Sequence, residues 1–281
     1  MYQKGSLSLK RADRMSKPID ILIIDDEQVV RDAVSRVCET AGLTVEAASD
    51  AKTGLDKIQK DEYRLVVCDV MLPDLDAFQI LEAMKQASLR TPVIMITGYS
   101  TMENAVNSLR RGAIDFIPKP FTADELESTI RRGLRYREID RVRASSEIRK
   151  GDPSRFSVPC PAGFYCLGYS SWAVIEEKGT GLIGITDLFL KTVSAVNEIR
   201  FFALDDDLVQ GSVCARVLSK DNLVHDVLSP LSGRIIESNV SLLPCPEMVE
   251  KDPYFSGWLY RIIPTDVAYE LRQLIAWVEN H

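Results

Sequence analysis

The sequence predicts a two-domain protein in which an α/β domain built on a parallel sheet precedes a mainly β domain. The chain has 281 residues, which is enough to bury two separate cores. Residues 19–130 alternate short β-branched runs with helical patterns, whereas residues 159–281 hold short strand-like runs separated by turns. Between the two halves, the segment GDPSRFSVPCPAG at 151–163 breaks the helical pattern and marks a linker.

Five apolar runs in the first half predict the strands of one parallel sheet. They do not alternate apolar with polar residues, as is typical of strands buried on both faces by helices. The runs are IDILIID (19–25), TVEAA (44–48), LVVCDV (65–70), PVIMIT (92–97) and DFIPK (115–119). The stretches VVRDAVSRVCETAG, AKTGLDKIQK, FQILEAMKQAS and MENAVNSLRRGA lie between them and predict the covering helices.

A capping box from Thr122 to Glu125 opens the last helix of this domain, which is expected to continue toward residue 145. Its segment RRGLRYREIDRVR is interpreted as a solvated face with Arg–Glu pairs, with a helical dimer contact as the alternative and a nucleic-acid contact disfavoured. We assign residues 131–158 to a helical linker. Residues 1–18 are polar and are expected to be a disordered extension.

The second half predicts a mainly β domain. Its strand-like runs are WAVIEE, LIGIT, EIRFFAL, SVCARVL, VHDVL and WLYRII, and KGTG and LSG supply turns. His225 is interpreted as a strand histidine, because no GxSxG accompanies it as a hydrolase triad would require. The end of the chain, DVAYELRQLIAWVENH at 266–281, predicts a closing helix with Asp266 as its N-cap.

Composition narrows the function classes. The net charge of −7 falls on residues 151–281, because residues 1–150 hold equal numbers of basic and acidic side chains. That half has no helix-turn-helix pattern, basic stripe or Walker loop, so neither nucleic-acid binding nor ATP hydrolysis is expected of it. No apolar run reaches the roughly 18 residues of a membrane span. We expect a cytoplasmic protein with no membrane partner.

The six cysteines include no CxxC pair and are interpreted as reduced, mostly buried thiols, with Cys38 and Cys68 inside apolar patterns. Cys160 and Cys245 each lie between two prolines. A metal or thiol sensor built from Cys160, Cys166 and Cys245 remains an alternative for the second half.

Polar residues gather where the predicted strands end. Asp25 and Asp26 follow the first run, Asp69 and Thr97 end two others, and Lys119 follows the last. Clustered carboxylates raise each other's pKa unless a cation is present, which predicts a hard divalent ion. Mg²⁺ prefers oxygen ligands and leaves room for a phosphoryl group, so the pattern predicts phosphoryl transfer.

The motifs DILIIDDE, VVCDVMLPD, MITGYS and FIPKPF resemble the receiver domain of two-component response regulators over residues 19–130. The resemblance implies a flavodoxin-like fold in which Asp69 accepts a phosphoryl group from a sensor histidine kinase or a phosphotransfer protein. It implies that Asp26, Asp69 and the backbone carbonyl of Met71 bind Mg²⁺ directly, with Asp25 acting mainly through water. Apart from its own phosphoryl transfer and dephosphorylation, no enzyme activity is expected.

The same resemblance implies that Lys119 and Thr97 contact the phosphoryl oxygens as catalytic groups. Phe116 matches an aromatic switch that moves inward together with Thr97. Ala77 replaces a glycine common in the family, which would cost about 1 kcal/mol if the position needs positive φ. Met71 and Tyr99 flank the acceptor and are neither acids nor amides, so we expect a long-lived phosphorylated state.

In the second half, YSSWAVIEEKGTGLIGITDLFL, VHDVLSPLSGRIIESN and PEMVEKDPYFSGWLYRI resemble the glycine cleavage H protein over about 160–265. The resemblance implies a biotinyl/lipoyl-like, barrel-sandwich hybrid fold. In that family a lysine eight residues before the proline of P-x-S-G carries lipoate, and that position here is Asn222. Lys220 lies two residues earlier, roughly 6–7 Å along a strand and away from the tip. We therefore expect an unlipoylated domain.

The leading interpretation is a response regulator whose receiver controls an H-protein-like interaction domain with an output partner that the sequence does not identify. Dimerisation through the receiver and the linker helix is a further partner hypothesis. The chief alternative is a lipoyl carrier, modified at Lys220 and gated by receiver phosphorylation.

Overall fold

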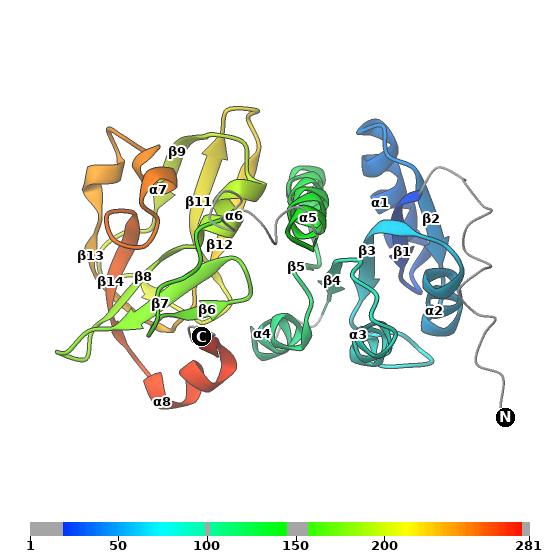
Figure 1. Cartoon of the computed structure of the whole chain (residues 1–281), viewed down its shortest axis with the longest axis horizontal. Coiled ribbons are helices and arrows are strands. Elements are labelled where there is room, and N and C mark those ends of the chain that lie inside the picture. The colour runs from blue at the N-terminus through cyan, green and yellow to red at the C-terminus, as the bar shows by residue number, and fades with distance from the viewer. Residues whose placement is uncertain (1–18, 99–101, 145–156, 277–281) are drawn as a thin grey trace, which may run out of the picture.

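The computed structural model describes residues 19–98, 102–144 and 157–276, which form two domains joined through a long helix (Figure 1). The N-terminal domain holds a five-stranded sheet in the order β2-β1-β3-β4-β5, and all its pairings are parallel. Its strands are β1 (Ile19–Ile24), β2 (Val45–Ala48), β3 (Tyr63–Asp69), β4 (Val93–Thr97) and β5 (Asp115–Pro118). The predicted parallel sheet is confirmed.

Helices cover both faces of this sheet. In Figure 1, α1 and α5 lie on one side and α2, α3 and α4 on the other. The helices are α1 (Gln28–Thr40), α2 (Ala51–Lys60), α3 (Ala77–Gln86), α4 (Met102–Arg111) and α5 (Ala123–Ala144). Residues 21–24 and 65–68 are fully buried, as expected for strands whose runs contain almost no polar side chains.

The start and the length of α5 agree with the sequence. Thr122 N–H donates to Glu125 Oε2 at 2.8 Å and Glu125 N–H donates to Thr122 Oγ1 at 3.2 Å, which is the predicted capping box. The helix also lies close to the sheet, since a Cβ at Gly133 would come within 2.9 Å of Leu65 Cδ1. The beginning of the segment assigned to the linker therefore packs on the N-terminal core.

The C-terminal domain is mainly β, as predicted, and holds two antiparallel sheets. One has seven strands in the order β10-β13-β14-β8-β7-β6-β15, and the other has the order β12-β11-β9. The strands are β6 (Tyr165–Leu167), β7 (Ser171–Ile175), β8 (Gly181–Ile185), β9 (Val196–Phe201), β10 (Asp207–Leu208), β11 (Val213–Ser219), β12 (Val224–Leu228), β13 (Gly233–Ser238), β14 (Trp258–Pro264) and β15 (Ile275–Ala276). Short helical turns connect them: α6 (Asp187–Thr192), η3 (Val240–Leu242), α7 (Met248–Lys251), α8 (Val267–Glu270) and η4 (Leu271–Gln273).

The predicted closing helix over 266–281 is wrong beyond its first turn. Asp266 caps α8 as expected by accepting from Tyr269 N–H at 3.1 Å, but α8 ends at Glu270. After η4 the chain becomes β15 and pairs with β6. The edge of β6 offers backbone N–H and C=O groups to a pairing strand, and this tertiary partner overrides the helical pattern. Residues 277–281 lie outside the described part of the chain.

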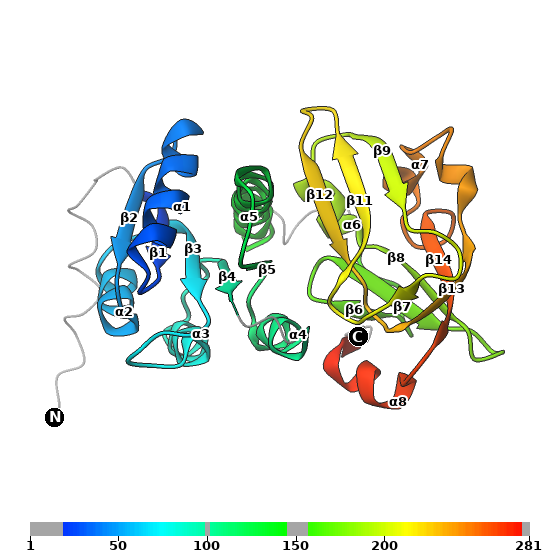
Figure 2. The same ribbon diagram turned by 180° about the vertical axis from the view of Figure 1, so that it is seen from behind.

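The two domains meet along one side of the N-terminal domain. α5 packs against α6 and β12, and α4 packs against β6 and η4. Figures 1 and 2 both show the C-terminal domain beside α4, β5 and α5. No helix within the described ranges is long and apolar enough to cross a membrane.

Candidate functional site

The predicted polar residues lie at one rim of the parallel sheet, as the sequence indicated. Asp69 ends β3 beside Ile96, and Thr97 ends β4 beside Pro118, so neighbouring strands deliver them together. Asp25 directly follows β1 and is fully buried, and Asp69 and Thr97 are also buried. Parallel strands place their carboxyl ends at the same edge, which is why residues far apart in the chain meet here.

Lys119 connects the acids of this rim. Its Nζ forms an ion pair with Asp69 Oδ2 and lies 3.0 Å from Asp25 Oδ2 and 2.8 Å from Glu27 Oε1. Burial alone would lower the pKa of Lys119, but the carboxylates around its ammonium raise that pKa above its ordinary value. The lysine therefore stays cationic and neutralises part of the acidic charge.

The buried carboxylate of Asp25 would be stabilised by a bound cation. Burial raises the pKa of Asp25 to about 6 and the charge of Asp69 adds to the effect, while the Lys119 ammonium opposes it. Apart from the Lys119 ammonium 3.0 Å away, Asp25 Oδ2 has no polar partner among the described residues. A buried carboxylate oxygen with that unused capacity fits a hard divalent cation, which takes oxygen ligands.

The described acidic cluster differs from the predicted ligand set. It consists of Asp25, Glu27 and Asp69, each with an oxygen within 4.8 Å of the others. Asp26 is exposed and is not one of them. Glu27 N–H donates to Asp25 Oδ1 at 2.9 Å, and the Glu27 carboxylate pairs with Lys119, which draws this side chain into the cluster. Sequence reasoning missed Glu27, although it follows the two aspartates directly.

Met71 lies beside the Asp69 carboxylate. Its backbone N–H donates to Asp69 Oδ1 at 2.8 Å, and the residue is 61% exposed. Both oxygens of Asp69 therefore have cationic or N–H partners. Tyr99, the other residue predicted to flank the acceptor, lies outside the described residues. The metal-binding roles of Asp26 and of the Met71 carbonyl stay predictions.

Phe116, the predicted switch residue, is buried in β5 beside Met95 of β4. Its N–H donates to the Asp115 carboxylate at 2.9 Å. Ala77 is the first residue of α3 and is not among the described residues with positive φ, so the expected strain is absent. Asp76 caps this helix instead, by accepting from Phe78 N–H.

The hairpin that carries Lys220 corrects one expectation. Ser219 N–H donates to Leu223 O and Asn222 N–H donates to Ser219 O, so Lys220 lies within the tight turn between β11 and β12. The side chain of Lys220 is exposed, and Asn222 takes the left-handed conformation with φ 64°. Lys220 is therefore at the hairpin tip and not on a strand away from it. The sequence count could not show this, because it assumed an extended backbone.

The interface between the domains buries a charge that the sequence did not reveal. Arg132 of α5 is 3% exposed, and its Nη2 donates to Asp115 Oδ2 at 2.7 Å. Its Nη1 donates to Ser128 Oγ at 2.9 Å and lies 3.2 Å from His225 Nδ1 of β12. The guanidinium also lies over the ring of Phe189, 5.2 Å from its centroid. The expectation that these arginines all face solvent is wrong for Arg132.

His225 completes this connection from the other domain. Its Nδ1 lies 2.8 Å from Ser128 Oγ and its Nε2 lies 3.1 Å from Ser219 Oγ. Burial, together with the nearby Arg132 charge, lowers the pKa of His225 to about 3. The imidazole is therefore neutral near pH 7. The strand position of His225 is as predicted, but its contact with α5 needed the tertiary structure.

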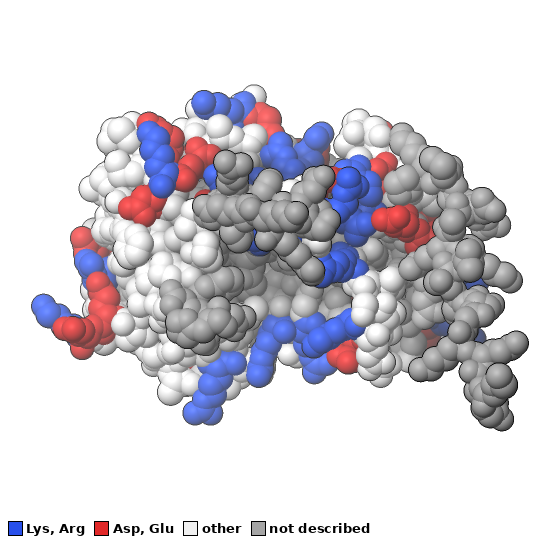
Figure 3. Space-filling model, in the orientation of Figure 1, with Lys and Arg blue, Asp and Glu red and all other residues white. Residues whose placement is uncertain are grey.

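Three of the other arginines of α5 form ion pairs, one of them along the helix as the sequence suggested and two with distant segments. Arg131 pairs with Glu127 one turn earlier, Arg137 with Glu62, and Arg135 with Asp221 of the hairpin turn. On the face shown in Figure 3, basic side chains gather over α5 and α4, between the two domains. Charged side chains of this helix therefore also contact the C-terminal domain.

Five cysteines are buried and Cys245 is exposed. Cys160 and Cys166 share a small core with Trp172 and Tyr254. The described residues contain no group of three cysteines close enough to hold one metal ion. The sensor built from Cys160, Cys166 and Cys245 is therefore not supported by the described geometry.

Comparisons with known proteins agree with this two-part architecture. Residues 21–131 match the response regulator receiver domain family, and residues 165–279 match the glycine cleavage H-protein family. The transcriptional regulatory protein DltR of Streptococcus agalactiae is 37% identical over 132 residues, covering 47% of this chain and 58% of that protein. HprR of Escherichia coli is 38% identical over 115 residues, covering 41% and 51%. The match spans about half the length of these curated relatives.

Two solved structures are similar to parts of this chain. The receiver domain of NtrX from Brucella abortus is 40% identical and covers 41% of this chain and 98% of that one, with a TM-score of 0.40. A glycine cleavage system H protein from Mycobacterium marinum is 26% identical and covers 37% and 86%, with a TM-score of 0.35.

Proposed function

We propose that this chain, which joins a response regulator receiver domain to a glycine cleavage H-protein domain, is a two-component response regulator phosphorylated at Asp69. A sensor histidine kinase or a phosphotransfer protein supplies the phosphoryl group. The single observation that carries the proposal is the buried Asp69 carboxylate held between the Lys119 ammonium and the Met71 N–H, next to Asp25 and Glu27. We propose further that the C-terminal domain is an output module that binds protein and not nucleic acid.

The chemistry follows from these contacts. An Asp69 oxygen attacks the phosphorus of a phosphohistidine, the P–N bond breaks, and its electron pair returns to the imidazole, which takes up a proton. Lys119 stays charged and neutralises one phosphoryl oxygen, and the Thr97 hydroxyl donates a hydrogen bond to another. A bound Mg²⁺ supplies charge neutralisation at the acids and the phosphoryl oxygens. Asp25 and Asp69, with Glu27 or Asp26, are the residues that would hold it.

The test is labelling of the full chain with acetyl phosphate and magnesium, read by intact mass. Wild type is expected to gain one phosphoryl group and Asp69→Asn none. Asp26→Asn and Glu27→Gln form a matched pair. The substitution that removes a ligand of the ion is expected to lower the labelling rate more, so the comparison identifies which acid supports the reaction. Well-folded wild type that stays unlabelled contradicts the proposal.

Phosphorylation is proposed to act on the second domain through β5 and α5. Thr97 and Phe116 lie on the two strands nearest this interface, and Phe116 N–H is bonded to Asp115, which in turn holds Arg132. Arg132 contacts His225 of the C-terminal domain. A movement of Phe116 would therefore reach the other domain through three adjoining contacts. An output partner captured equally by phosphorylated wild type and Asp69→Asn contradicts this control.

A second candidate function rests on the position of Lys220. Because this lysine is exposed at the hairpin tip, it is accessible to a lipoate ligase. Expression with lipoate and ligase, followed by intact mass, separates the two candidates. The lipoyl carrier requires a fixed mass increase that Lys220→Ala removes and Lys251→Ala retains. An unchanged wild-type mass supports the unmodified output module.

A further inference from the structure

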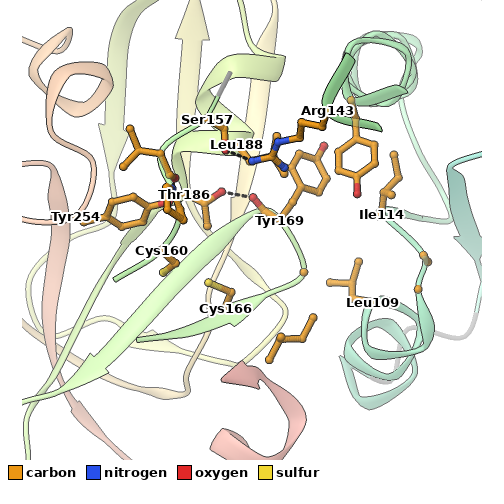
Figure 4. A pocket seen from close by; sticks show the side chains of 17 residues that line it. Leu109, Ile114, Arg143, Ser157, Cys160, Cys166, Tyr169, Thr186, Leu188 and Tyr254 are labelled. Atoms are coloured by element: carbon orange, nitrogen blue, oxygen red, sulfur yellow. Dashed lines mark hydrogen bonds between the residues drawn. The ribbon is translucent and has the colours of Figure 1, made fainter. Parts of the chain in front are cut away.

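A cavity of about 320 Å³ lies between the two domains, away from the phosphorylation site (Figure 4). Its volume is within the range of small-molecule sites, about 300–1,000 Å³. From the N-terminal domain and α5 it is lined by Leu109, Gly112, Ala113, Ile114, Tyr136 and Arg143. From the C-terminal side it is lined by residues that include Val158, Cys160, Cys166, Tyr169, Leu188 and Tyr254. Since each domain supplies one wall, the cavity exists only while the domains are docked.

The walls are mainly apolar and aromatic, and most of their polar atoms already have partners. Tyr254 Oη donates to Val158 O at 3.0 Å and accepts from Asp187 N–H at 3.2 Å. Thr186 Oγ1 donates to Tyr169 O. A ligand would therefore bury an apolar body against these walls and find few free hydrogen-bonding groups along them.

Arg143 is the cationic exception. Its Nη2 donates to Ser157 Oγ at 2.5 Å, which uses one of the five N–H donors of the guanidinium. Figure 4 shows Arg143 reaching from α5 toward Ser157 at one end of the cavity. Asp187, a buried acid that Arg143 influences electrostatically, accepts from Val158 N–H at 2.7 Å and lies 3.9 Å from Lys191 Nζ. Asp187 and Arg143 form no ion pair among the described residues, so the guanidinium can bind another anion.

We propose that this interdomain cavity binds a small monocarboxylate with an apolar chain or ring, whose carboxylate pairs with Arg143. The apolar body fills the space between Ile114 on one side and Leu188 and Tyr254 on the other. Because the ligand contacts both walls, it binds the docked arrangement better than the separated one and stabilises docking. The ligand needs no phosphoryl group on Asp69 in order to bind, so the site is a second input beside phosphorylation. Because phosphorylation is proposed to loosen docking, the two inputs oppose each other.

Isothermal titration calorimetry of the full chain with octanoate tests the proposal, with octanamide as the uncharged probe of equal length. Octanoate is expected to bind wild type, and Arg143→Gln is expected to weaken it roughly tenfold by removing a charge-assisted hydrogen bond. Octanamide should bind wild type more weakly than octanoate and should not distinguish Arg143→Gln from wild type.

Two further variants locate the site. Arg141→Gln removes the same charge from an exposed position of the same helix and is expected to leave the affinity for octanoate unchanged. Leu188→Trp places a larger side chain at a half-buried position of the cavity wall and is expected to abolish binding. The proposal is overturned if wild type binds no octanoate, if Arg143→Gln binds it normally, if Arg141→Gln weakens it equally, or if Leu188→Trp has no effect. These titrations need no phosphorylation, so their failure is distinct from failure of the acetyl phosphate test.

Discussion

The most consequential single residues lie in two buried polar groups with different chemistry. At the sheet rim, Asp25 and Asp69 are buried beside Lys119, and the arrangement suits a cation and a phosphoryl group. At the domain interface, Arg132 is neutralised by Asp115 and bonded to neutral groups of α5. Removing the partner of a buried charge strongly lowers the stability of the fold, so single substitutions at either place should have large effects.

His225 gives a prediction about pH. Its pKa is lowered to about 3 in the folded protein against an ordinary value of 6.5, so the unfolded chain binds the proton first. This group's stabilising contribution is complete above pH 6.5 and is lost as pH falls from there toward 3. At pH 5 the loss is about 2 kcal/mol. Urea unfolding at pH 7.5 and pH 5, followed by tryptophan fluorescence, measures it.

The His225→Asn variant is the control for that measurement, because asparagine keeps hydrogen-bonding capacity and does not titrate. Acidic groups elsewhere contribute equally to both proteins, so the difference between the two pH dependences isolates His225. All three tryptophans lie in the second half of the chain, and the fluorescence therefore reports the domain that contains it. Parallel pH dependences for the two proteins would contradict the assignment.

Arg132 gives a second prediction. Replacing it with methionine leaves Asp115 buried without its cation, which is expected to lower the free energy of unfolding by about 3–5 kcal/mol. Adding Asp115→Asn should recover part of the loss, since the unpaired charge is then removed. Denaturant titration of both variants checks this. Arg131→Met, which removes an exposed Arg–Glu pair one position earlier, should cost at most about 1 kcal/mol.

At the scale of elements, close packing decides which residue types are tolerated. Gly184 of β8 lies directly against the indole of Trp172, and a Cβ there would approach its Cζ2 to 2.4 Å. The indole is fixed because its Nε1 donates to both Ile185 O and Pro253 O. Glycine is therefore required by the neighbouring side chain and not by the backbone conformation of the strand.

Gly184→Ala is expected to destabilise the C-terminal domain by about 1–3 kcal/mol, because the indole must leave both carbonyls or the strands must separate. The emission spectrum of the folded protein should also shift. Gly181→Ala, in the same strand, meets only Ile262 and Leu231 side chains at 3.2–3.3 Å and should cost less. Equal losses for the two variants would show that the indole contact is not the cause.

At the scale of the whole molecule, the docked C-terminal domain covers the side of the receiver formed by α4, β5 and α5. Across this contact the ring centroids of Tyr136 and Tyr169 lie 5.2 Å apart. Arg135 of α5 also pairs with Asp221 in the hairpin turn. The hairpin that presents Lys220 is thus held by the helix that also carries Arg132. Docking, hairpin position and receiver state are expected to change together.

Phosphorylation with acetyl phosphate is predicted to increase amide hydrogen exchange in β12 and in residues 132–144 of α5, because a shift of β5 weakens the Asp115–Arg132–His225 contacts. Mass spectrometry of peptides from the full chain measures this, and β2, at the opposite edge of the sheet from β5, supplies an internal reference. Asp69→Asn treated in the same way should show no increase. Unchanged exchange in phosphorylated wild type would show that phosphorylation does not weaken docking.

The sequence by itself determined the parallel sheet, the capping box of α5 and the rim position of Asp25, Asp69, Thr97 and Lys119. Each depends on local apolar pattern, on short-range capping, or on the rule that parallel strands end at one edge. The mainly β character of the second half was visible for the same reason, because strands and turns leave local patterns.

Only the tertiary structure decided the entry of Glu27 into the acidic cluster, the burial of Arg132, the contact of His225 with α5 and the pairing of β15 with β6. Each depends on a partner that lies more than 90 residues away in the chain: Lys119 for Glu27, His225 for Arg132, and β6 for β15. Pattern and propensity describe a residue's neighbourhood along the chain, whereas burial and charge pairing depend on what folding brings next to it.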